Sequence, residues 1–414
     1  MGAHRRIHQS RIGSARLTRG GHLPALLAAA ALCASARAQD WPQWRGPART
    51  GVSAETNWSS KGADAPLWTR SVGLGYSCVV VSGDRLYTAG WDEGKGHDVI
   101  WCLEARTGEE LWTHSYPAEK WAKYHGGGTN CTPSLDGASL FLLNREGRLT
   151  CLDAASGDVR WAKHMVRDHG ASVPTWGFAA SPLVLDDMLV INVGSIFAMD
   201  KTSGEVIWKS RNLGHAYSTP ADATFDGRSC LVVFNGGGLA VLDRGKGEVL
   251  ATNEWKTSYD INAATPIVVD GRRIFISSGY NHGCGMFEFS GSSLTSLWES
   301  KAMRNQMSGC VLVDGHLYGF DDAVLKCIDL EGNEKWQVRG LGQGSVSAAG
   351  NRILALGGKG DLVIADADPS AFEEQWRGKV LDGGVCWTMP VLANGLVYCR
   401  NSLGMLTCRD HRQQ

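Results

Sequence analysis

The chain has 414 residues, of which 41 are Lys or Arg and 42 are Asp or Glu, so its formal net charge is −1. No run of Lys and Arg occurs beyond residue 38, which argues against nucleic acid as a partner. Glycine is frequent, with 52 residues, and charged residues make up only 20% of the chain. This composition favours a fold of short strands and tight turns.

The first 38 residues differ from the rest of the chain. They contain six Arg, no acidic residue and an apolar run from Leu23 to Ala36 that ends in Ala36-Arg-Ala38. The run is shorter than the ~20 residues that a membrane span requires. This pattern is typical of a secretory signal peptide. We therefore predict that residues 1–38 are removed, that the mature chain begins at Gln39, and that the protein is periplasmic or extracellular.

Residues 39–65 follow as an N-terminal arm. The arm opens with Trp41-Pro-Gln-Trp44-Arg-Gly-Pro47, and its Pro and Gly residues are unfavourable in regular elements. We predict an extended strap that packs on the side of the fold through its Trp residues.

From residue 66 onwards the chain contains a repeat. One copy has apolar runs at Leu140–Leu143 and Arg148–Leu152, then Asp153-Ala-Ala-Ser-Gly157, and Trp161 four residues after the glycine. The Asp can accept hydrogen bonds from its own turn, and the Gly can adopt a positive φ. One such unit cannot bury its own faces, so it must be stacked on others. The recurring tryptophans are Trp68, Trp112, Trp161, Trp208, Trp255, Trp298, Trp336 and Trp376.

The spacing of these tryptophans matches the roughly 40–45 residues of a four-stranded propeller blade. Strand triplets are predicted to begin near Tyr76, Thr129, Phe178, Tyr217, Asn262, Met307, Gly344 and Cys386. The last triplet has no Trp strand after it, whereas Trp68 precedes the first. We therefore predict an all-β, eight-bladed β-propeller over residues 66–410. The Trp68 strand completes the C-terminal blade, because closure of the ring removes free strand edges.

Proline and cysteine recur at fixed places in the triplets. Proline falls within the innermost strands, whose free edge faces the channel and tolerates a missing N–H. Cysteines fall in first and third strands, which lie about 9–10 Å apart at ~4.8 Å per strand. That separation is beyond disulfide reach, so we predict buried, unpaired thiols.

The repeat resembles that of a known family. Val311-Leu-Val-Asp-Gly-His-Leu-Tyr318 and Val79-Val-Val-Ser-Gly-Asp-Arg-Leu-Tyr87 are similar to the PQQ-type repeat of quinoprotein dehydrogenases, and equally to the repeat of the non-catalytic outer-membrane assembly factor BamB. The first resemblance implies PQQ and calcium as cofactors. The second implies a protein scaffold at the periphery of the outer membrane. Two features of the dehydrogenases are missing, namely adjacent cysteines and a Cys-x-x-Cys-His haem motif.

Polar and aromatic residues gather in the connections that lead into the first strands. In a propeller these connections share one face and surround the mouth of the channel. We predict a rim that binds a ligand or partner, formed by His125, Asn130, Trp176, His215, Tyr217, Asp260, Asn262, Gln306 and Trp387. No spacing of metal ligands is present.

Two classes of function remain open from the sequence. We favour a non-catalytic, monomeric binding or scaffold protein without a cofactor, whose ligand is a protein or another polymer. The alternative is a PQQ- and calcium-dependent oxidoreductase, in which Asp260 is the general base and Trp176 or Trp387 stacks on the quinone. If the protein is not an enzyme, Asp260 is expected to cap a turn. A carbohydrate- or peptide-binding propeller is a further alternative.

Overall fold

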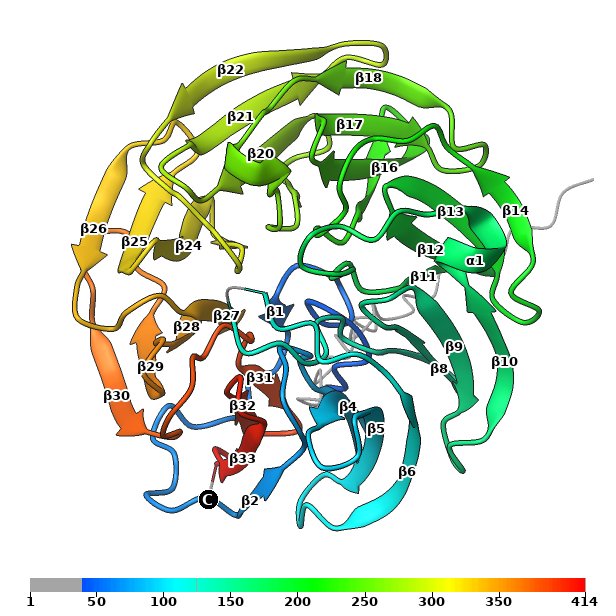
Figure 1. Ribbon diagram of the computed structural model, residues 1–414. Helices are drawn as coiled ribbons and strands as arrows, with labels where there is room; N and C mark the ends of the chain where they lie inside the picture. The colour runs from blue at the N-terminus through cyan, green and yellow to red at the C-terminus, as the bar shows by residue number, and fades with distance from the viewer. Residues whose placement is uncertain (1–38, 124, 414) are drawn as a thin grey trace, which may run out of the picture. The chain divides into compact units, whose positions relative to one another are not determined.

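The structure is a computed structural model that describes residues 39–413 with the exception of residue 124. The predicted signal peptide, residues 1–38, lies outside the described residues. The described strands form eight sheets, arranged as blades around a central channel (Figure 1). The prediction of an eight-bladed β-propeller is therefore confirmed. The helices in this part of the chain are α1 (Met165–His169) and the 3-10 helix η1 (Ser258–Asp260), and none is long and apolar enough to span a membrane.

The first four blades each consist of four consecutive antiparallel strands. Blade 1 contains β3 (Val80–Ser82), β4 (Arg85–Asp92), β5 (His97–Glu104) and β6 (Glu110–Pro117). Blade 2 contains β7 (Ser134–Asp136), β8 (Ser139–Leu143), β9 (Arg148–Asp153) and β10 (Val159–His164). Blade 3 contains β11 (Leu183–Leu185), β12 (Met188–Val193), β13 (Ser195–Asp200) and β14 (Val206–Lys209). Blade 4 contains β15 (Ala221–Phe225), β16 (Arg228–Asn235), β17 (Gly238–Asp243) and β18 (Val249–Asn253).

The remaining blades include both strands contributed by the N-terminal region. Blade 5 contains β19 (Ile267–Val268), β20 (Arg273–Ser278), β21 (Gly283–Phe289) and β22 (Leu294–Ser300). Blade 6 contains β23 (Val311–Val313), β24 (His316–Asp321), β25 (Val324–Asp329) and β26 (Glu334–Val338). Blade 7 contains β27 (Ser345–Ala349), β28 (Arg352–Leu356), β29 (Asp361–Asp366) and β30 (Glu374–Lys379), with β1 (Val52–Ser53) on its inner edge. Blade 8 contains β31 (Val391–Ala393), β32 (Leu396–Arg400), β33 (Met405–Asp410) and β2 (Trp68–Ser71).

The ring closes as predicted, between the N-terminal strand β2 and the C-terminal strand β33. The two strands are antiparallel, with Trp68 opposite Cys408 and Ser71 opposite Met405. Arg400, on β32, adds a second link, since its buried guanidinium donates to the carbonyl oxygens of Gly73 and Ala89 at the start of the ring. Blade 8 is thereby joined to blade 1 by strand pairing and by a charged side chain.

Each repeat couples one blade to the next through its Trp and Gly residues. Gly157 of blade 2 has φ 80°, and a Cβ atom at this position would lie 2.6 Å from the ring of Trp112 of blade 1. The indole Nε1 of Trp112 donates to the carbonyl oxygen of Ala154 in the same turn of blade 2. Gly108 and Trp68 repeat this arrangement between blades 1 and 8. The Trp side chain therefore packs against the Gly turn of the following blade. It also lies on the outer strand of its own blade, as the sequence indicated.

The turn chemistry of the repeat is as predicted, and one tryptophan departs from the pattern. Asp153 accepts hydrogen bonds from the backbone N–H groups of Ala155 and Ser156 at 2.8 and 3.1 Å. Trp255 lies beyond the end of β18, and its Nε1 donates to Ser278. Trp255 therefore does not occupy the outer-strand position that the other tryptophans share.

The innermost strands begin later than the sequence suggested. The first begins at Val80 rather than near Tyr76, and the second at Ser134 rather than near Thr129. Pro133 directly precedes the second of these strands, and proline has the same place before β11, β15, β19 and β31. A residue without an N–H and with a fixed φ marks the boundary here. The placement of these prolines within the strands was therefore wrong.

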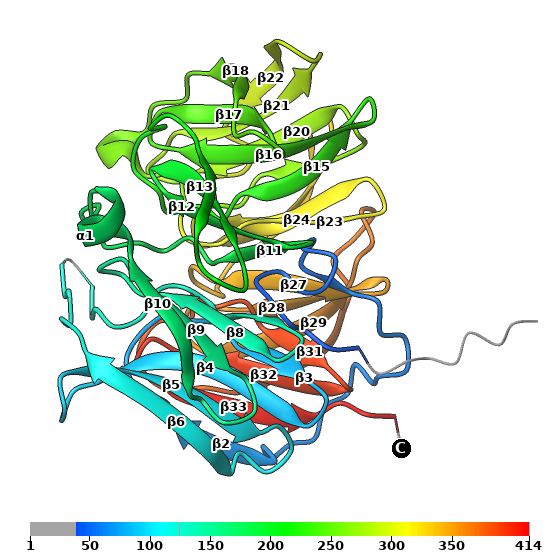
Figure 2. The same cartoon turned by 90° about the vertical axis from the view of Figure 1, so that its right-hand side faces the viewer.

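The N-terminal arm does not pack on the side of the propeller. Figure 2 shows it on the face opposite to α1, where its residues cross the end of the channel. It also contains β1, which pairs in parallel with β27. The arm contacts every blade, through Trp41 to Val81, Pro42 to Leu135, Arg49 to Val184 and Asp222, Trp44 to Thr265, Arg45 to Cys310, Val52 to Ala348, and Glu55 to Asn394 and Gly395.

Cysteine is used as a small core residue. All eleven cysteines in the described part of the chain are buried and unpaired. Burial raises the pKa of their thiols, to about 12 for Cys78 and Cys386. These side chains pack with apolar residues from neighbouring blades, as Cys131 and Cys151 do in a cluster that extends over blades 1 to 3.

Candidate ligand-binding site at the channel mouth

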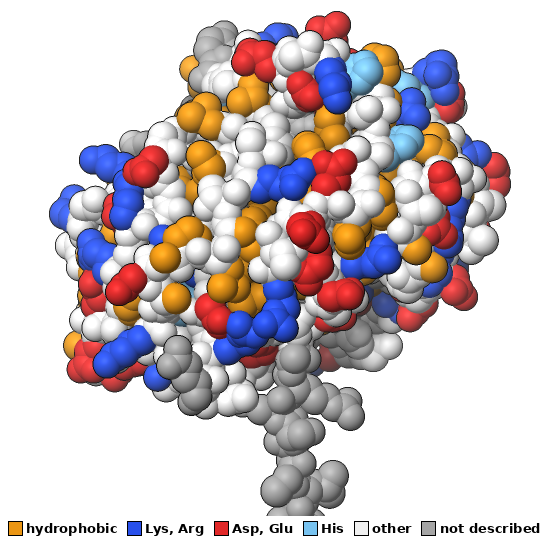
Figure 3. Space-filling model, turned by 90° about the horizontal axis from the view of Figure 1, so that it is seen from below, with side chains coloured by type: hydrophobic (Ala, Val, Ile, Leu, Met, Phe, Trp, Pro, Cys, Tyr) orange, Lys and Arg blue, Asp and Glu red, His pale blue; other side chains and the backbone are white. Residues whose placement is uncertain are grey.

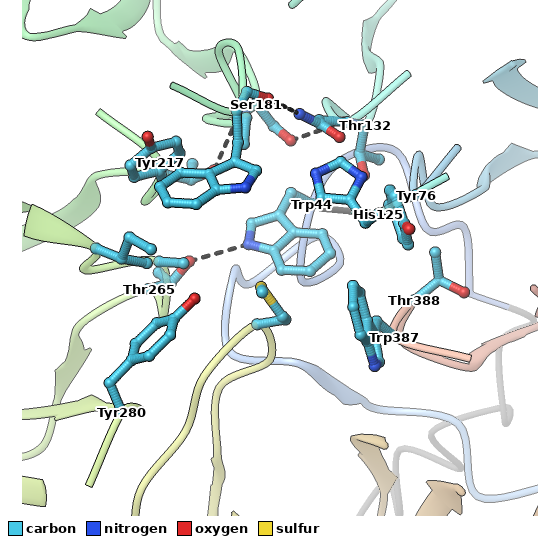
Figure 4. A pocket seen from close by; sticks show the side chains of 17 residues that line it. Trp44, Tyr76, His125, Thr132, Ser181, Tyr217, Thr265, Tyr280, Trp387 and Thr388 are labelled. Atoms are coloured by element: carbon cyan, nitrogen blue, oxygen red, sulfur yellow. Dashed lines mark hydrogen bonds between the residues drawn. The ribbon is translucent and has the colours of Figure 1, made fainter. Parts of the chain in front are cut away.

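The connections between blades enclose a cavity of about 140 Å³ at the mouth of the channel. Seven of the eight connections from an outer strand to the next innermost strand, all but the one between β26 and β27, place one or more side chains around it (Figure 4). The lining residues are Trp44, Tyr76, His125, Asn130, Thr132, Trp176, Ala179, Ser181, Tyr217, Thr219, Ile261, Ala263, Thr265, Tyr280, Met307, Trp387 and Thr388. The cavity is therefore built from residues that are distant in sequence.

Trp44, from the N-terminal arm, forms the floor of this cavity. Its indole Nε1 donates to Thr265 Oγ1 at 3.0 Å, as Figure 4 shows. A second cavity, lined by Trp44, Arg45 and Arg49 among others, lies between the arm and blades 3 to 6. Trp44 therefore lies between two cavities, the upper one at the channel mouth and the lower one beside the arm.

The walls of the upper cavity are aromatic. On one side Tyr76 stacks on Trp387 with ring centroids 5.2 Å apart, and His125 meets the edge of Tyr76 at 5.5 Å. On the other side Trp176 and Tyr217 make an edge contact at 6.0 Å. These are favourable geometries for aromatic pairs, so each ring is held by its neighbour.

His125 is a neutral group in this wall. Burial and the nearby Arg145 guanidinium lower the pKa of His125 to about 4. Its Nδ1 accepts a hydrogen bond from the backbone N–H of Gly127 at 3.2 Å. The remaining proton of the neutral ring is therefore on Nε2.

Arg145 holds the connections in position from below the cavity surface. Its buried guanidinium donates to the carbonyl oxygen of Lys120 at 2.9 Å and to Asn130 Oδ1 at 3.0 Å. Asn130 in turn donates to the carbonyl oxygen of Trp176 at 3.0 Å. Burial lowers the pKa of Arg145 to about 10, so the side chain remains charged. This chain of hydrogen bonds links the connections that precede blades 2 and 3.

The predicted rim residues fall into two groups. Those that line the cavity are His125, Asn130, Trp176, Tyr217 and Trp387. His215 and Asp260 are exposed and lie outside it, Asn262 is fully buried, and the amide of Gln306 accepts a hydrogen bond from Gln343.

Asn262 and Asp260 are predicted rim residues that do not line the cavity. The amide of Asn262 donates to the carbonyl oxygens of Asn235 and Trp255, so its polar atoms face the protein. Asp260 has φ 54° and donates its backbone N–H to Thr257, in a turn at the surface.

Sequence reasoning missed three rings that line the cavity. Trp44 was assigned to the side of the fold, because the arm lies outside the repeat. Tyr76 is at the start of a triplet, at the same place in the repeat as Tyr217, which is a predicted rim residue. This equivalence could have identified Tyr76 as a rim residue. Tyr280 lies in a turn between second and third strands, on the face that the sequence identified.

The lining residues do not fit a bound PQQ group with calcium. None of the described lining residues is Lys, Arg, Asp or Glu, so the carboxylates of this quinone would have no cationic partner there. The cavity is also smaller than the ~300–1,000 Å³ typical of sites for drug-sized ligands. Within residues 39–413, leaving out residue 124, no cluster of three or more His, Cys, Asp or Glu is arranged to hold a metal ion.

Comparison with known proteins places the chain in a family. The family model described as outer membrane protein assembly factor BamB matches residues 96–337, more than half of the chain. The BamB protein of Burkholderia pseudomallei is 24% identical over 367 residues, which cover 82% of this chain and 85% of that protein.

Solved structures share the fold at lower identity. BamB from Moraxella catarrhalis has a TM-score of 0.60 at 17% identity, with 84% of this chain and 99% of that chain covered. Quinohemoprotein alcohol dehydrogenase from Comamonas testosteroni has a TM-score of 0.62 at 13% identity, with 91% and 81% covered. Both the repeat resemblance and the propeller architecture are thus accounted for, and the chain belongs to the family of the outer membrane protein assembly factor BamB.

Proposed function

We propose that this protein is an exported, non-catalytic scaffold that binds a protein partner at the channel mouth. The observation that carries the proposal is the aromatic, uncharged cavity formed where the blade connections meet. Propellers use this face for ligands, and aromatic residues are enriched at protein-binding surfaces. The name of the family, outer membrane protein assembly factor, supports a partner from the cell envelope.

Several features support a binding role rather than catalysis. The described lining residues include no carboxylate that could act as a general base, and the neutral His125 is held by a backbone hydrogen bond. On the face shown in Figure 3, acidic and basic side chains are intermixed, without the broad basic surface that nucleic acid requires. An exported location accords with the predicted signal peptide and with the family description.

A capture experiment tests the proposal. The tagged protein is incubated with extracts of the cell envelope, and retained proteins are identified. In a second sample His125, Trp176, His215 and Tyr217 are all replaced by Ala. We expect a specific partner to bind the original protein and to be lost from the variant, whose circular dichroism spectrum should remain that of the folded propeller.

The enzymatic alternative is tested in parallel. The purified protein is supplied with PQQ and Ca²⁺, and the reduction of an artificial electron acceptor is measured. A scaffold gives no turnover. Dye reduction that depends on added PQQ and disappears in Asp260→Asn would refute the proposal.

A further inference from the structure

The size of the upper cavity limits what can enter it. Its volume of about 140 Å³ is close to that of a well-studied engineered protein cavity of ~150 Å³ that binds benzene. A fused, multi-ring ligand needs several times this space. The cavity therefore has room for one ring of six or so atoms.

The Ser and Thr hydroxyls that line the cavity are already engaged in hydrogen bonds within the protein. Each lining Ser and Thr hydroxyl makes a hydrogen bond within the protein. Thr132 accepts from the N–H of Cys78, Ser181 from that of Thr132, and Thr219 from that of Ser181, while Thr265 accepts from Trp44 and Thr388 donates to the carbonyl oxygen of Arg400. The first three of these bonds connect the segments that precede neighbouring innermost strands. A sugar ring, which needs several hydrogen-bond partners, would find few free ones here.

The charge of the cavity also selects its ligand. The described lining residues carry no formal charge when His125 is neutral, so a carboxylate group would be desolvated without a cationic partner. An apolar ring, by contrast, would lie between the Tyr76–Trp387 pair and Tyr217, next to Trp44 (Figure 4). Aromatic rings gain from such edge and offset contacts beyond the area they bury.

We propose that this cavity is an anchor site for one uncharged aromatic side chain, Phe or Tyr, presented by an extended segment of a partner protein. The proposal rests on the proposed scaffold function and specifies what the channel mouth recognises. A single aromatic anchor in a fitted pocket is a common origin of binding energy at protein interfaces. The loops around the cavity mouth then contact the backbone that flanks the anchor.

Titration calorimetry with small amides tests the anchor directly. The probes are N-acetyl-phenylalaninamide, N-acetyl-tyrosinamide, N-acetyl-leucinamide and methyl glucoside, each titrated into the purified protein. We expect the aromatic amides to bind with a Kd on the order of 1 mM. The leucine amide should bind at least about fivefold more weakly, because it lacks ring contacts, and the glucoside should not bind.

Two variants locate the binding. Ala263→Phe fills the cavity from its wall, and Tyr76→Ala removes one ring of the stacked pair. Both variants should raise the Kd of the aromatic amides by about tenfold or more. In Ala263→Phe the ring of the amide has no space, and in Tyr76→Ala it loses one aromatic contact. Arg211→Ala is the matched control, because Arg211 is exposed in the connection that carries Tyr217 and does not line the cavity. It should leave the Kd unchanged.

The outcomes separate this proposal from the proposed function. Equal binding of the leucine and phenylalanine amides, binding of the glucoside, or unchanged affinity in Ala263→Phe would each overturn the aromatic anchor. If the amides fail to bind but an envelope partner is still captured through the rim, the anchor is wrong and the scaffold function stands. If the amides bind as expected and no partner is captured, the anchor site stands and the scaffold function is refuted.

Discussion

Trp68 offers the sharpest test of how the ring is closed. It is separated by more than 300 residues from Cys408, the residue that faces it on β33. Its side chain is only 9% exposed, and its Nε1 donates to the carbonyl oxygen of Ala105 at 3.0 Å. Trp68→Ala removes a large buried side chain, which costs ~3–5 kcal/mol, and a hydrogen bond worth ~1 kcal/mol. We therefore expect the free energy of unfolding to fall by about 4 kcal/mol.

Urea unfolding followed by far-ultraviolet circular dichroism measures this change. Trp112→Ala is the matched comparison, because Trp112 makes the same contact with Gly157 and Ala154 inside the ring. Leu67→Ala is the surface control, since Leu67 is 44% exposed, and it should change stability by less than ~0.5 kcal/mol. If Trp68→Ala costs less than ~1 kcal/mol while Trp112→Ala is severe, β2 is a dispensable appendage and the closure argument fails.

The remaining predictions concern ionisation, thiols, the channel floor and export. Burial raises the pKa of Asp98 to about 6 from 3.8, so the folded state keeps this proton where the unfolded chain loses it. The contribution of Asp98 to the free energy of unfolding is therefore present below pH 4 and is lost as pH rises to 6, by about 3 kcal/mol. Between pH 4 and pH 7 the urea midpoint of Asp98→Asn should fall by less than that of the original protein. An equal fall in the two proteins would refute the assignment. The eleven buried thiols of the described chain should not react with Ellman's reagent until the protein is denatured, and fewer than eleven after denaturation would indicate disulfides. Trp44→Ala should abolish amide binding and lower the unfolding free energy by ~2 kcal/mol, since this side chain is half-buried; retained binding would show that Trp44 is not the floor. N-terminal sequencing of the exported protein should begin at Gln39, and finding Met1 would contradict the signal peptide.

The fold could be predicted because the repeat carries local chemistry. The Asp turn at Asp153 and the positive φ of Gly157 are decided by residues within one segment, and both occur in the structure. Repetition of this segment then determines the number of blades. The contact of Trp112 is not local in this way, because its partners, Gly157 and Ala154, lie on the next blade. The sequence gives the spacing of Gly and Trp but does not indicate that the two belong to adjacent blades.

The candidate site could be predicted only in its location. Blade periodicity indicates which connections share the channel face, and five of the nine predicted rim residues line the cavity. Periodicity does not indicate the direction of a side chain within a connection. Asn262 and Trp387 both lie at the entry to an innermost strand, yet the amide of Asn262 bonds to the backbone while the ring of Trp387 borders the cavity. That difference depends on tertiary packing.

The arm explains why a channel can serve as a pocket. A propeller channel is open at both ends unless something fills it, and here Trp44 lies between the cavity at the mouth and the cavity beside the arm. Its position requires Gly46, which has φ 78° and packs directly against the ring of Trp41. Arg45 then anchors the turn by donating to the carbonyl oxygens of Thr50 and Cys310. Trp41, Trp44, Arg45 and Gly46 thus each have a structural role in the arm. The cavity at the mouth therefore depends on a segment that lies outside every repeat.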